Sequence, residues 1–331
     1  MKHDIKGEGG VVVKKTLAPE SPAGVRQKLN KSSFRKNVDL SLLALPAFVL
    51  LILFYFVPLP GIVLAFKNYN FIDGIFKSPW IGLKNFIFIF STSDALLALK
   101  NTILYNAVFI VTSIVGSVIL AILLNEILSR RVLKVYQTAI FLPYFLSWTI
   151  VAYIVFALLD NSKGMINSIL SAMGMAEIEW YFEPQYWFWI HIVLHFWKTM
   201  GYATLLNYAY ILSIDPSYYE AASIDGANRF QMALKITIPA LRPIILINFL
   251  GALGRIFNAD FGQFFLVPME SPSLRDVSSV LDTYVYSALR GSADLGMGAA
   301  AGVFQSMAGF ILVLAANFVI RYRYGREQAI F

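Results

Sequence analysis

The chain has 331 residues, of which 58% are hydrophobic and only 14% are charged. Because soluble domains carry about 25% charged residues, this composition excludes an ordinary water-soluble globule and predicts an integral membrane protein. Cysteine is absent, which excludes disulfides, thiol catalysis and cysteine-based metal sites. The net charge of +7 could suggest a nucleic-acid partner, but the positions of Lys and Arg indicate membrane orientation instead, so no nucleic acid is expected.

Residues 1–38 are polar and basic, and they contain no apolar stretch of the kind found in a signal peptide. They predict a flexible cytoplasmic tail, with an arm that binds lipid headgroups as the alternative. Residues 39–331 are predicted to form one transmembrane domain in contact with membrane lipid.

Six windows after the tail are long and apolar enough to span a membrane, which takes about 20 residues. In chain order they are Leu40–Phe66, Ile103–Leu124, Ala139–Leu159, Trp187–Ile211, Ile244–Val267 and Met297–Ile320. The sequence therefore predicts an all-α polytopic membrane protein with six transmembrane helices. Small residues in or beside the last window are predicted to let helices approach closely, namely Gly296, Gly298, Gly302 and Gly309.

Lys and Arg are concentrated in the tail, in the loops that follow windows two and four, and after window six. The remaining loops carry fewer of them. Cytoplasmic loops are enriched in Lys and Arg, so the first set of loops is predicted to be cytoplasmic. Both termini are then cytoplasmic, as an even number of spans requires.

A polar, helix-forming segment, residues 214–240, separates windows four and five on the predicted cytoplasmic side. Asp215 and the proline after it have the order of an N-cap and a first helical residue, so Ser217–Ile224 is predicted to be a helix. Gly226 then permits a sharp turn with positive φ.

The second half of this segment, Asn228–Ile238, is predicted to be a further helix, which Pro239 ends. A rigid unit of two helices between two spans can act as a lever that a soluble partner moves. Ala221 and Ala222 are small enough to approach a groove on the partner closely, and Glu220 offers a carboxylate to a basic group. The alternative is an ordinary connecting helix at the membrane interface.

The spacing of this segment resembles the EAA loop of ABC importer permeases. That loop reads Glu-Ala-Ala, three residues, Gly, nine residues, and then Ile-x-Leu-Pro. The chain has Glu220-Ala221-Ala222, Gly226 and Ile236-Thr237-Ile238-Pro239 at these spacings, with Ile where Leu is usual. The stretch EAASIDGAN, which includes Asp225, further resembles the carbohydrate-importer branch of these permeases.

Other stretches resemble permeases that import oligosaccharides derived from polysaccharides. They are Phe56–Phe86, Phe141–Trp148 (FLPYFLSW), Asp282–Arg290 (DTYVYSALR) and Gly302–Tyr324. A departure occurs at Phe261-Gly262-Gln263, where relatives often carry Phe-Asp-Gln, and it weakens the transfer of a substrate-contact role to that stretch.

The resemblance implies a maltose-type permease subunit of an oligosaccharide ABC importer in the bacterial cytoplasmic (inner) membrane. It implies a second permease that shares the translocation path, two cytoplasmic ATPase subunits and an external solute-binding protein. The residues that it assigns to ATPase coupling are Glu220, Ala221, Ala222, Asp225, Gly226, Ile236 and Pro239. No G-x-x-x-x-G-K-[ST] segment is present, so ATP and Mg²⁺ are expected on the ATPase partners. The chain itself is expected to be no enzyme and to hold no cofactor.

Polar groups inside transmembrane spans usually face a cavity or a partner. The candidate substrate-path residues are Trp197, Lys198, Asn207, Asn248, Arg255, Asn258 and Asp260. An aromatic ring suits the apolar face of a sugar, and the cations Lys198 and Arg255 are compatible with uronic as well as neutral oligosaccharides. The alternatives are that Lys198 caps the carbonyls of a neighbouring helix, that Arg255 and Asp260 pair with each other or with the partner permease, and that the amides join helices.

His191 and His195 have the i, i+4 spacing of a metal pair, but no third ligand is near them in sequence. Aromatic packing is therefore the favoured interpretation, and no metal is expected. Two other classes of function are open to a chain of this kind. An ion-driven secondary transporter predicts inverted repeats, broken spans and proton or sodium ligands at the midplane, and no convincing repeat is present. An intramembrane enzyme needs a nucleophile with its base, or a metal site.

Overall fold

The computed structural model describes residues 31–292 and 294–325. Within these residues the chain is almost entirely helical, with an isolated antiparallel bridge between Lys67 and Trp80 and no β-strand. It divides into two units, Met1–Leu59 and Pro60–Phe331. The all-helical class predicted from composition is confirmed.

The first unit contains α1 (Lys31–Leu51), which continues into the π-helical turn η1 (Ile52–Phe56). Residues 31–38, assigned above to the flexible tail, form the start of α1, and the domain boundary itself stays a prediction. The rest of the predicted tail lies outside the described residues. Pro46 sits inside α1, and the apolar run from Ser41 to Phe66 is long enough to cross a membrane.

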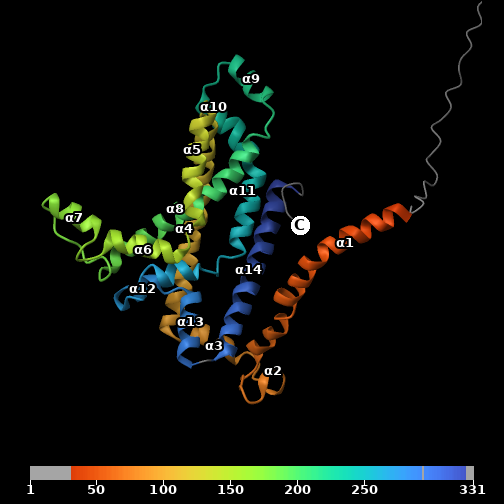
Figure 1. Cartoon of the computed structure of the whole chain (residues 1–331), viewed down its shortest axis with the longest axis vertical. Coiled ribbons are helices and arrows are strands. Elements are labelled where there is room, and N and C mark those ends of the chain that lie inside the picture. Colours follow the sequence, from red (N-terminus) through yellow and green to blue (C-terminus); the bar gives the residue numbers. More distant parts are fainter. Residues whose placement is uncertain (1–30, 293, 326–331) are drawn as a thin grey trace, which may run out of the picture. The chain divides into compact units, whose positions relative to one another are not determined.

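The second unit is built around four long helices (Figure 1). They are α4 (Ser93–Asn125), α8 (Trp187–Ile211), α11 (Ile238–Leu253) and α14 (Leu295–Tyr324). The shorter α-helices are α2 (Gly74–Lys77), α3 (Lys84–Ser91), α5 (Arg130–Phe141), α6 (Trp148–Leu159), α7 (Met165–Ala172), α9 (Ser217–Ile224), α10 (Arg229–Met232), α12 (Arg275–Ser278) and α13 (Leu281–Ser292). The 3₁₀ and π turns are η2 (Leu59–Phe66), η3 (Leu142–Phe145), η4 (Pro184–Tyr186), η5 (Ala233–Thr237), η6 (Gly262–Leu266) and η7 (Pro272–Leu274).

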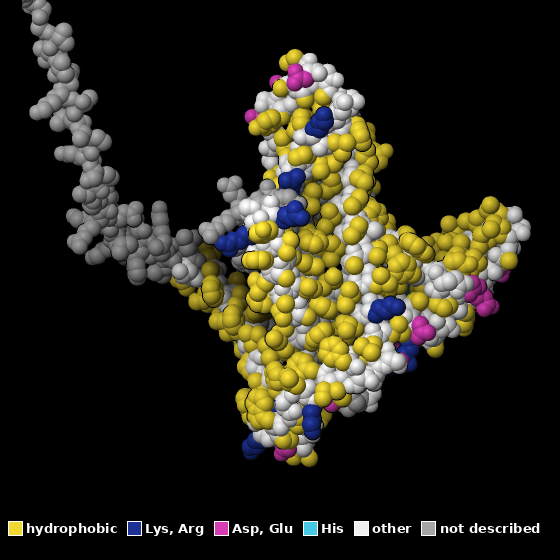
Figure 2. Space-filling model, turned by 180° about the vertical axis from the view of Figure 1, so that it is seen from behind, with side chains coloured by type: hydrophobic (Ala, Val, Ile, Leu, Met, Phe, Trp, Pro, Cys, Tyr) yellow, Lys and Arg dark blue, Asp and Glu magenta, His cyan; other side chains and the backbone are white. Residues whose placement is uncertain are grey.

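The long helices run between two different ends of this unit (Figure 1). Helix α9 lies at one end, and α2, α3 and α13 lie at the other. Between the ends, apolar side chains cover much of the flank, as Figure 2 shows. Helix α4 packs most extensively against α8 and also contacts α11, which brings three long helices together around one space.

Four helical stretches in the described residues are long and apolar enough to cross a membrane. They are Ser41–Phe66, Ser93–Asn125, Arg229–Leu253 and Leu295–Arg323, and a bent pair, Arg130–Phe145 with Trp148–Leu159, gives a fifth if it counts as one span. Helix α8 has the bounds predicted for window four. It is not among these four stretches, because its indole, imidazole and ammonium groups lower its mean hydropathy. A polytopic membrane protein is supported, and the count of six spans stays a prediction.

The prediction of one helix over Ala139–Leu159 is wrong. Helix α5 ends at Phe141, because Pro143 has no N–H and the chain tightens into the 3₁₀ turn η3. Ser147 then caps a new helix, α6, by accepting a hydrogen bond from the backbone N–H of Ile150. The two helical parts are bent by 100° relative to each other.

The prediction of one helix over Ile244–Val267 is also wrong. Helix α11 ends at Leu253, and the chain is irregular until η6 begins at Gly262. The side chain of Asn106 on α4 donates hydrogen bonds to the carbonyls of Ile256 and Asn258, at 2.9 Å and 3.0 Å. These tertiary hydrogen bonds take the place of the helical ones, because a backbone carbonyl in a membrane protein must find a partner.

The contact of α14 with α11 depends on Gly309, because a Cβ there would lie 2.2 Å from the carbonyl oxygen of Gly254. Gly302 on the same helix has open space around such a Cβ. We expect Gly309→Ala to lower the stability of the detergent-solubilised protein by about 1–3 kcal/mol through overpacking. Gly302→Ala should leave the stability unchanged or raise it by up to about 1 kcal/mol, because alanine favours a helix. Thermal unfolding of the two variants checks this, and equal melting temperatures would contradict it.

Candidate functional site

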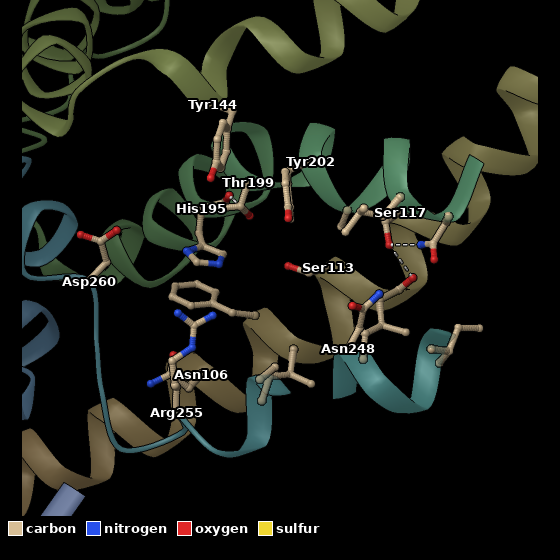
Figure 3. Close-up of a pocket in the computed structure, with 18 of the residues that line it drawn as sticks. Asn106, Ser113, Ser117, Tyr144, His195, Thr199, Tyr202, Asn248, Arg255 and Asp260 are labelled. Atoms are coloured by element: carbon tan, nitrogen blue, oxygen red, sulfur yellow. Dashed lines mark hydrogen bonds between the residues drawn. The ribbon is translucent and has the colours of Figure 1, made fainter. Parts of the chain in front are cut away.

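A cavity of about 570 Å³ opens between α4, α8, α11 and the irregular chain after α11 (Figure 3). Its polar side chains carry mainly amide and hydroxyl groups: Asn106, Ser113, Ser117, Tyr144, Thr199, Tyr202, Asn207, Asn248 and Asn258. His195, Arg255 and Asp260 also line it. Such a lining offers many hydrogen-bonding groups to a hydroxyl-rich ligand.

The structure brings five of the seven candidate substrate-path residues to this cavity. They are Asn207, Asn248, Arg255, Asn258 and Asp260. Trp197 and Lys198 do not line it. Whether any of these residues contacts a substrate stays a prediction.

Sequence reasoning missed the polar residues that α4 contributes to the cavity. Asn106, Ser113 and Ser117 are spaced by seven and four residues, so they share one face of the helix. That spacing was the available signal. Near one end of this row, Ser117 accepts a hydrogen bond from the buried amide of Asn207 at 3.0 Å. The side-chain oxygen of Asn207 is buried without a hydrogen-bond partner in the described structure.

The residues Gly254–Phe261 form one wall of the cavity and are called the floor segment here. Arg255, Asn258 and Asp260 all belong to it. Figure 3 shows Arg255 beside Asn106, on the opposite side of the cavity from Tyr144 and Thr199. The floor segment is not helical, and this irregular backbone lets Arg255 and Asp260 both lie at the cavity.

The suggested structural pair of Arg255 and Asp260 is not formed within the described chain. No ion pair joins them, and they do not share a helix. One carboxylate oxygen of Asp260 accepts a hydrogen bond from Nε1 of Trp148 at 2.6 Å, and the other accepts from the backbone N–H of Gly262 at 3.0 Å. The guanidinium of Arg255 has neither an ion pair nor a hydrogen bond with residues 31–292 or 294–325. It is the cationic group that the cavity offers to a ligand.

Gly262, the departure noted in the sequence, is explained by the indole of Trp148. A Cβ at position 262 would lie 2.6 Å from Cδ1 and 2.8 Å from Cβ of Trp148. The absence of a side chain therefore lets the indole lie against the backbone and reach Asp260. This contact joins the start of α6 to the end of the floor segment.

Lys198 acts as a cap in this structure. Its Nζ donates a hydrogen bond to the carbonyl of Tyr144 at 3.2 Å and lies 5.2 Å from the ring centroid of Trp148. This arrangement agrees with the capping alternative, because Tyr144 belongs to η3, where helical hydrogen bonding is interrupted. Neither Lys198 nor Trp197 lines the cavity, so their positions do not support a direct substrate role.

The two histidines pack among aromatic rings and have separate hydrogen-bond partners. His191 is buried, and its Nε2 lies 3.1 Å from Oγ of Ser278. His195 stacks on Phe109 with 3.7 Å between ring centroids, and its Nδ1 lies 3.1 Å from Oε1 of Gln263. The aromatic-packing interpretation is confirmed, and the described residues contain no cluster of His, Asp and Glu suited to a metal ion.

Helix α9 has the bounds predicted for the first half of the polar segment. Asp215 accepts a hydrogen bond from the backbone N–H of Ser217 at 2.9 Å, and this bond lowers the pKa of the Asp215 carboxyl. Gly226 has a φ of 78°, in the left-handed region that favours glycine. The predicted helix and glycine turn are therefore confirmed as local structure.

The prediction that Pro239 ends the second helix is wrong. Helix α10 begins with a capping box between Asn228 and Gln231, and it continues through η5 directly into α11. In η5 the backbone N–H of Ile238 bonds to the carbonyl of Ala233, one residue further back than in an α-helix. Pro239 then lies in the first turn of α11, where its missing N–H is tolerated.

The segment after Gly226 is fastened both to α9 and to the end of α4. The hydroxyl of Tyr219 lies 2.9 Å from that of Thr237, and Arg229 forms an ion pair with Glu126. A groove of about 410 Å³ lies at the turn. Its lining includes four of the seven predicted coupling residues, Ala222, Asp225, Gly226 and Ile236. The unit thus has the form of a stiff element with a recess that a partner side chain can enter.

Long apolar helices around a cavity that carries amide, hydroxyl and charged groups, with a structured polar turn at one end, are features expected of a helical membrane permease. Residues 113–321 match the family of the binding-protein-dependent transport system inner membrane component. The chain belongs to this family.

Similar proteins extend the match over most of the chain. It is 34% identical to the polygalacturonan/rhamnogalacturonan transport system permease protein YteP of Bacillus subtilis (strain 168), over 87% of this chain and 89% of the relative. It is 32% identical to protein LplB of the same organism, over 88% of this chain and 91% of the relative. The relatives with descriptive names are transport permeases and not enzymes.

Two solved structures share the fold. A bacterial ABC transporter involved in the import of the acidic polysaccharide alginate contains a chain with a TM-score of 0.78 and 30% identity, covering 89% of this chain and 99% of that one. A bacterial alginate ABC transporter in complex with alginate pentasaccharide-bound periplasmic protein gives a TM-score of 0.78 at 28% identity, covering 90% and 99%. The chain thus has the fold of permeases that work in such assemblies.

Proposed function

We propose that the chain is a permease subunit of an ATP-driven ABC importer for oligosaccharides that contain uronic acids. The family and its sugar-transporting relatives support the importer class. The observation that carries the acidic substrate is the guanidinium of Arg255, which lines the cavity without a partner in the described residues. Polygalacturonan and alginate, the polymers named for the relatives, are both built from uronic acids.

The proposed chemistry at the cavity is binding without reaction. The planar guanidinium of Arg255 can donate two parallel hydrogen bonds to one carboxylate. Such charge-assisted hydrogen bonds are stronger than hydrogen bonds between neutral groups. Amides such as Asn248 and Asn258 can bind sugar hydroxyls along the rest of the lining. Asp260 forms no ion pair with Arg255 in the described structure, and its two oxygens accept hydrogen bonds from Trp148 and Gly262 instead.

The proposed assembly contains a second permease, two cytoplasmic ATPase subunits and an external solute-binding protein. In this assembly six helices of the chain, including α8, cross the inner membrane, and both termini are cytoplasmic. ATP and Mg²⁺ bind the ATPase subunits, whose closure moves α9 and the continuous helix from α10 to α11. The cavity then opens outward to the loaded binding protein and closes again after hydrolysis.

The ion-driven alternative predicts broken spans, and the helices are broken at η3 and at the floor segment, but family membership favours the binding-protein-dependent importer. The chain belongs to a family defined by binding-protein-dependent transport. The broken helices at η3 and at the floor segment carry hydrogen bonds to other elements of the chain, as described above.

Arg255→Ala tests the proposed substrate class. In vesicles that contain the assembled transporter, we expect the half-saturating concentration for short oligogalacturonides to rise about tenfold to a hundredfold, from the loss of a charge-assisted bond worth roughly 1.5–3 kcal/mol. Uptake of neutral oligosaccharides of the same length, if they are carried, should change little. Arg275→Ala is the control, because Arg275 forms an exposed ion pair with Asp94 outside the cavity lining. Unchanged uptake of the acidic sugar by Arg255→Ala would refute the proposal.

A further inference from the structure

The floor segment is fastened by two side chains that do not line the cavity. Asp282, in the first turn of α13, accepts a hydrogen bond on Oδ2 from the backbone N–H of Ala259 at 2.7 Å. Gln305 on α14 donates from Nε2 to the carbonyl of Phe257 at 2.8 Å and to the same Oδ2 of Asp282 at 3.2 Å. The middle of the floor segment is thus held from α13 and α14 at once, on either side of Asn258.

The surroundings of Asp282 disfavour the charged form of its carboxyl group. Its side chain is half-buried, Gln305 beside it is buried, and no ion pair with a described residue compensates the charge. Burial, and to a lesser extent the charge of Asp260, raise the pKa of Asp282 above the ordinary value for aspartate. A carboxylate held in such a place needs compensating hydrogen bonds, and it receives them from Ala259 and Gln305 as well as from its own backbone N–H.

We infer that Asp282, together with Gln305, is a positioning residue that fixes the floor segment so that Arg255 faces the substrate. This inference rests on the proposed function, in which Arg255 binds the sugar carboxylate. A single oxygen of Asp282 accepts both hydrogen bonds, so the position requires an acceptor atom and does not require the negative charge. Misplacement of a binding group by even a small distance weakens its interactions, although the segment remains folded.

The uptake experiment compares three variants in the assembled transporter. Asp282→Ala is expected to raise the half-saturating concentration for oligogalacturonides about tenfold, while the maximal rate of ATP hydrolysis stays near that of the wild type. Asp282→Asn should behave like the wild type, because the amide oxygen can replace Oδ2 as the acceptor. Asp276→Ala, which removes a neighbouring carboxylate from α12 outside these contacts, is the control.

A double-mutant cycle shows whether Asp282 acts through Arg255. In an Arg255→Ala background, Asp282→Ala should raise the half-saturating concentration by less than about twofold, because the group that it positions is gone. A full additive effect in that background would contradict the inference, as would a loss of function in Asp282→Asn equal to that in Asp282→Ala.

A second measurement does not depend on substrate. The chain has no cysteine, so Asn258→Cys introduces a unique thiol on the floor segment. We expect thiol modification in native membranes to become several-fold faster when Asp282→Ala or Gln305→Leu is added, and to stay unchanged with Asp282→Asn. Equal rates in all of these proteins would overturn the inference. Faster labelling combined with normal acidic-sugar uptake in Arg255→Ala would instead keep the positioning role and reject the proposed function.

Discussion

Replacing Gly226 with proline is expected to reduce sugar uptake to background while the assembled transporter still hydrolyses ATP. Proline fixes φ near −65°, whereas Gly226 has a φ of 78°, so the turn after α9 cannot form. The substitution also removes the hydrogen bond from the N–H of Gly226 to the carbonyl of Ser223 at 3.1 Å. The lever would lose its shape at the groove where an ATPase subunit is proposed to bind.

The control for this variant is Gly174→Pro. Gly174 also has a positive φ, 74°, has open space around it, and donates a hydrogen bond to the carbonyl of Ser171 at 3.0 Å. It lies in the region after α7, which is predicted to be external. Both variants should be present in membranes in similar amounts, and only Gly226→Pro should separate ATP hydrolysis from uptake. Coupled transport by Gly226→Pro, measured as sugar moved per ATP hydrolysed, would refute the lever.

Replacing Gly262 with alanine is expected to reduce uptake of acidic oligosaccharides more than tenfold. The new Cβ would lie within 2.9 Å of three atoms of Trp148, so the indole must move and its hydrogen bond to Asp260 is lost. Overpacking costs about 1–3 kcal/mol, and the lost bond to a charged group about 1.5–3 kcal/mol. The carboxylate of Asp260, which lines the same cavity as Arg255, would then be free to compete with a substrate carboxylate for the guanidinium.

Gly251→Ala is the matched control, because a Cβ at that position on α11 meets no atom within 4 Å. Uptake of acidic and neutral oligosaccharides by both variants, together with the amount of each protein in the membrane, checks the prediction. Normal uptake of acidic sugar by Gly262→Ala would show that the contact of Trp148 with Asp260 does not matter for transport.

Local features of the sequence were sufficient where each residue acts on its immediate neighbours. Asp215 caps the residue two positions ahead, Ser217–Ile224 forms the helix as predicted, and Gly226 adopts positive φ. These outcomes follow from capping and steric preferences that span a few residues. The bounds of α8, Trp187–Ile211, were likewise readable from the apolar run and its polar flanks.

The breaks in the helices could not be read in the same way. The apolar run over Ile244–Val267 looks like one span, and only the amide of Asn106, 150 residues away from Ile256, shows where the carbonyls of the floor segment go. Pro239 was predicted to end a helix, but the helix continues through it, because the π turn η5 precedes the proline. The sequence left open whether Lys198 faces a cavity or a carbonyl, and the position of η3 decided that it caps Tyr144.

The sequence by itself determined that the protein belongs in a membrane, that it is helical, and that a glycine turn follows Ser217–Ile224, because composition and short-range spacing act without knowledge of distant contacts. The tertiary structure decided which polar residues share the cavity and which charge stays available in it. Asp260 is engaged by Trp148 and Gly262, and the floor segment is held by Asn106, Asp282 and Gln305. These partners are far apart in the chain, so only the packing of α4, α6, α13 and α14 brings them together.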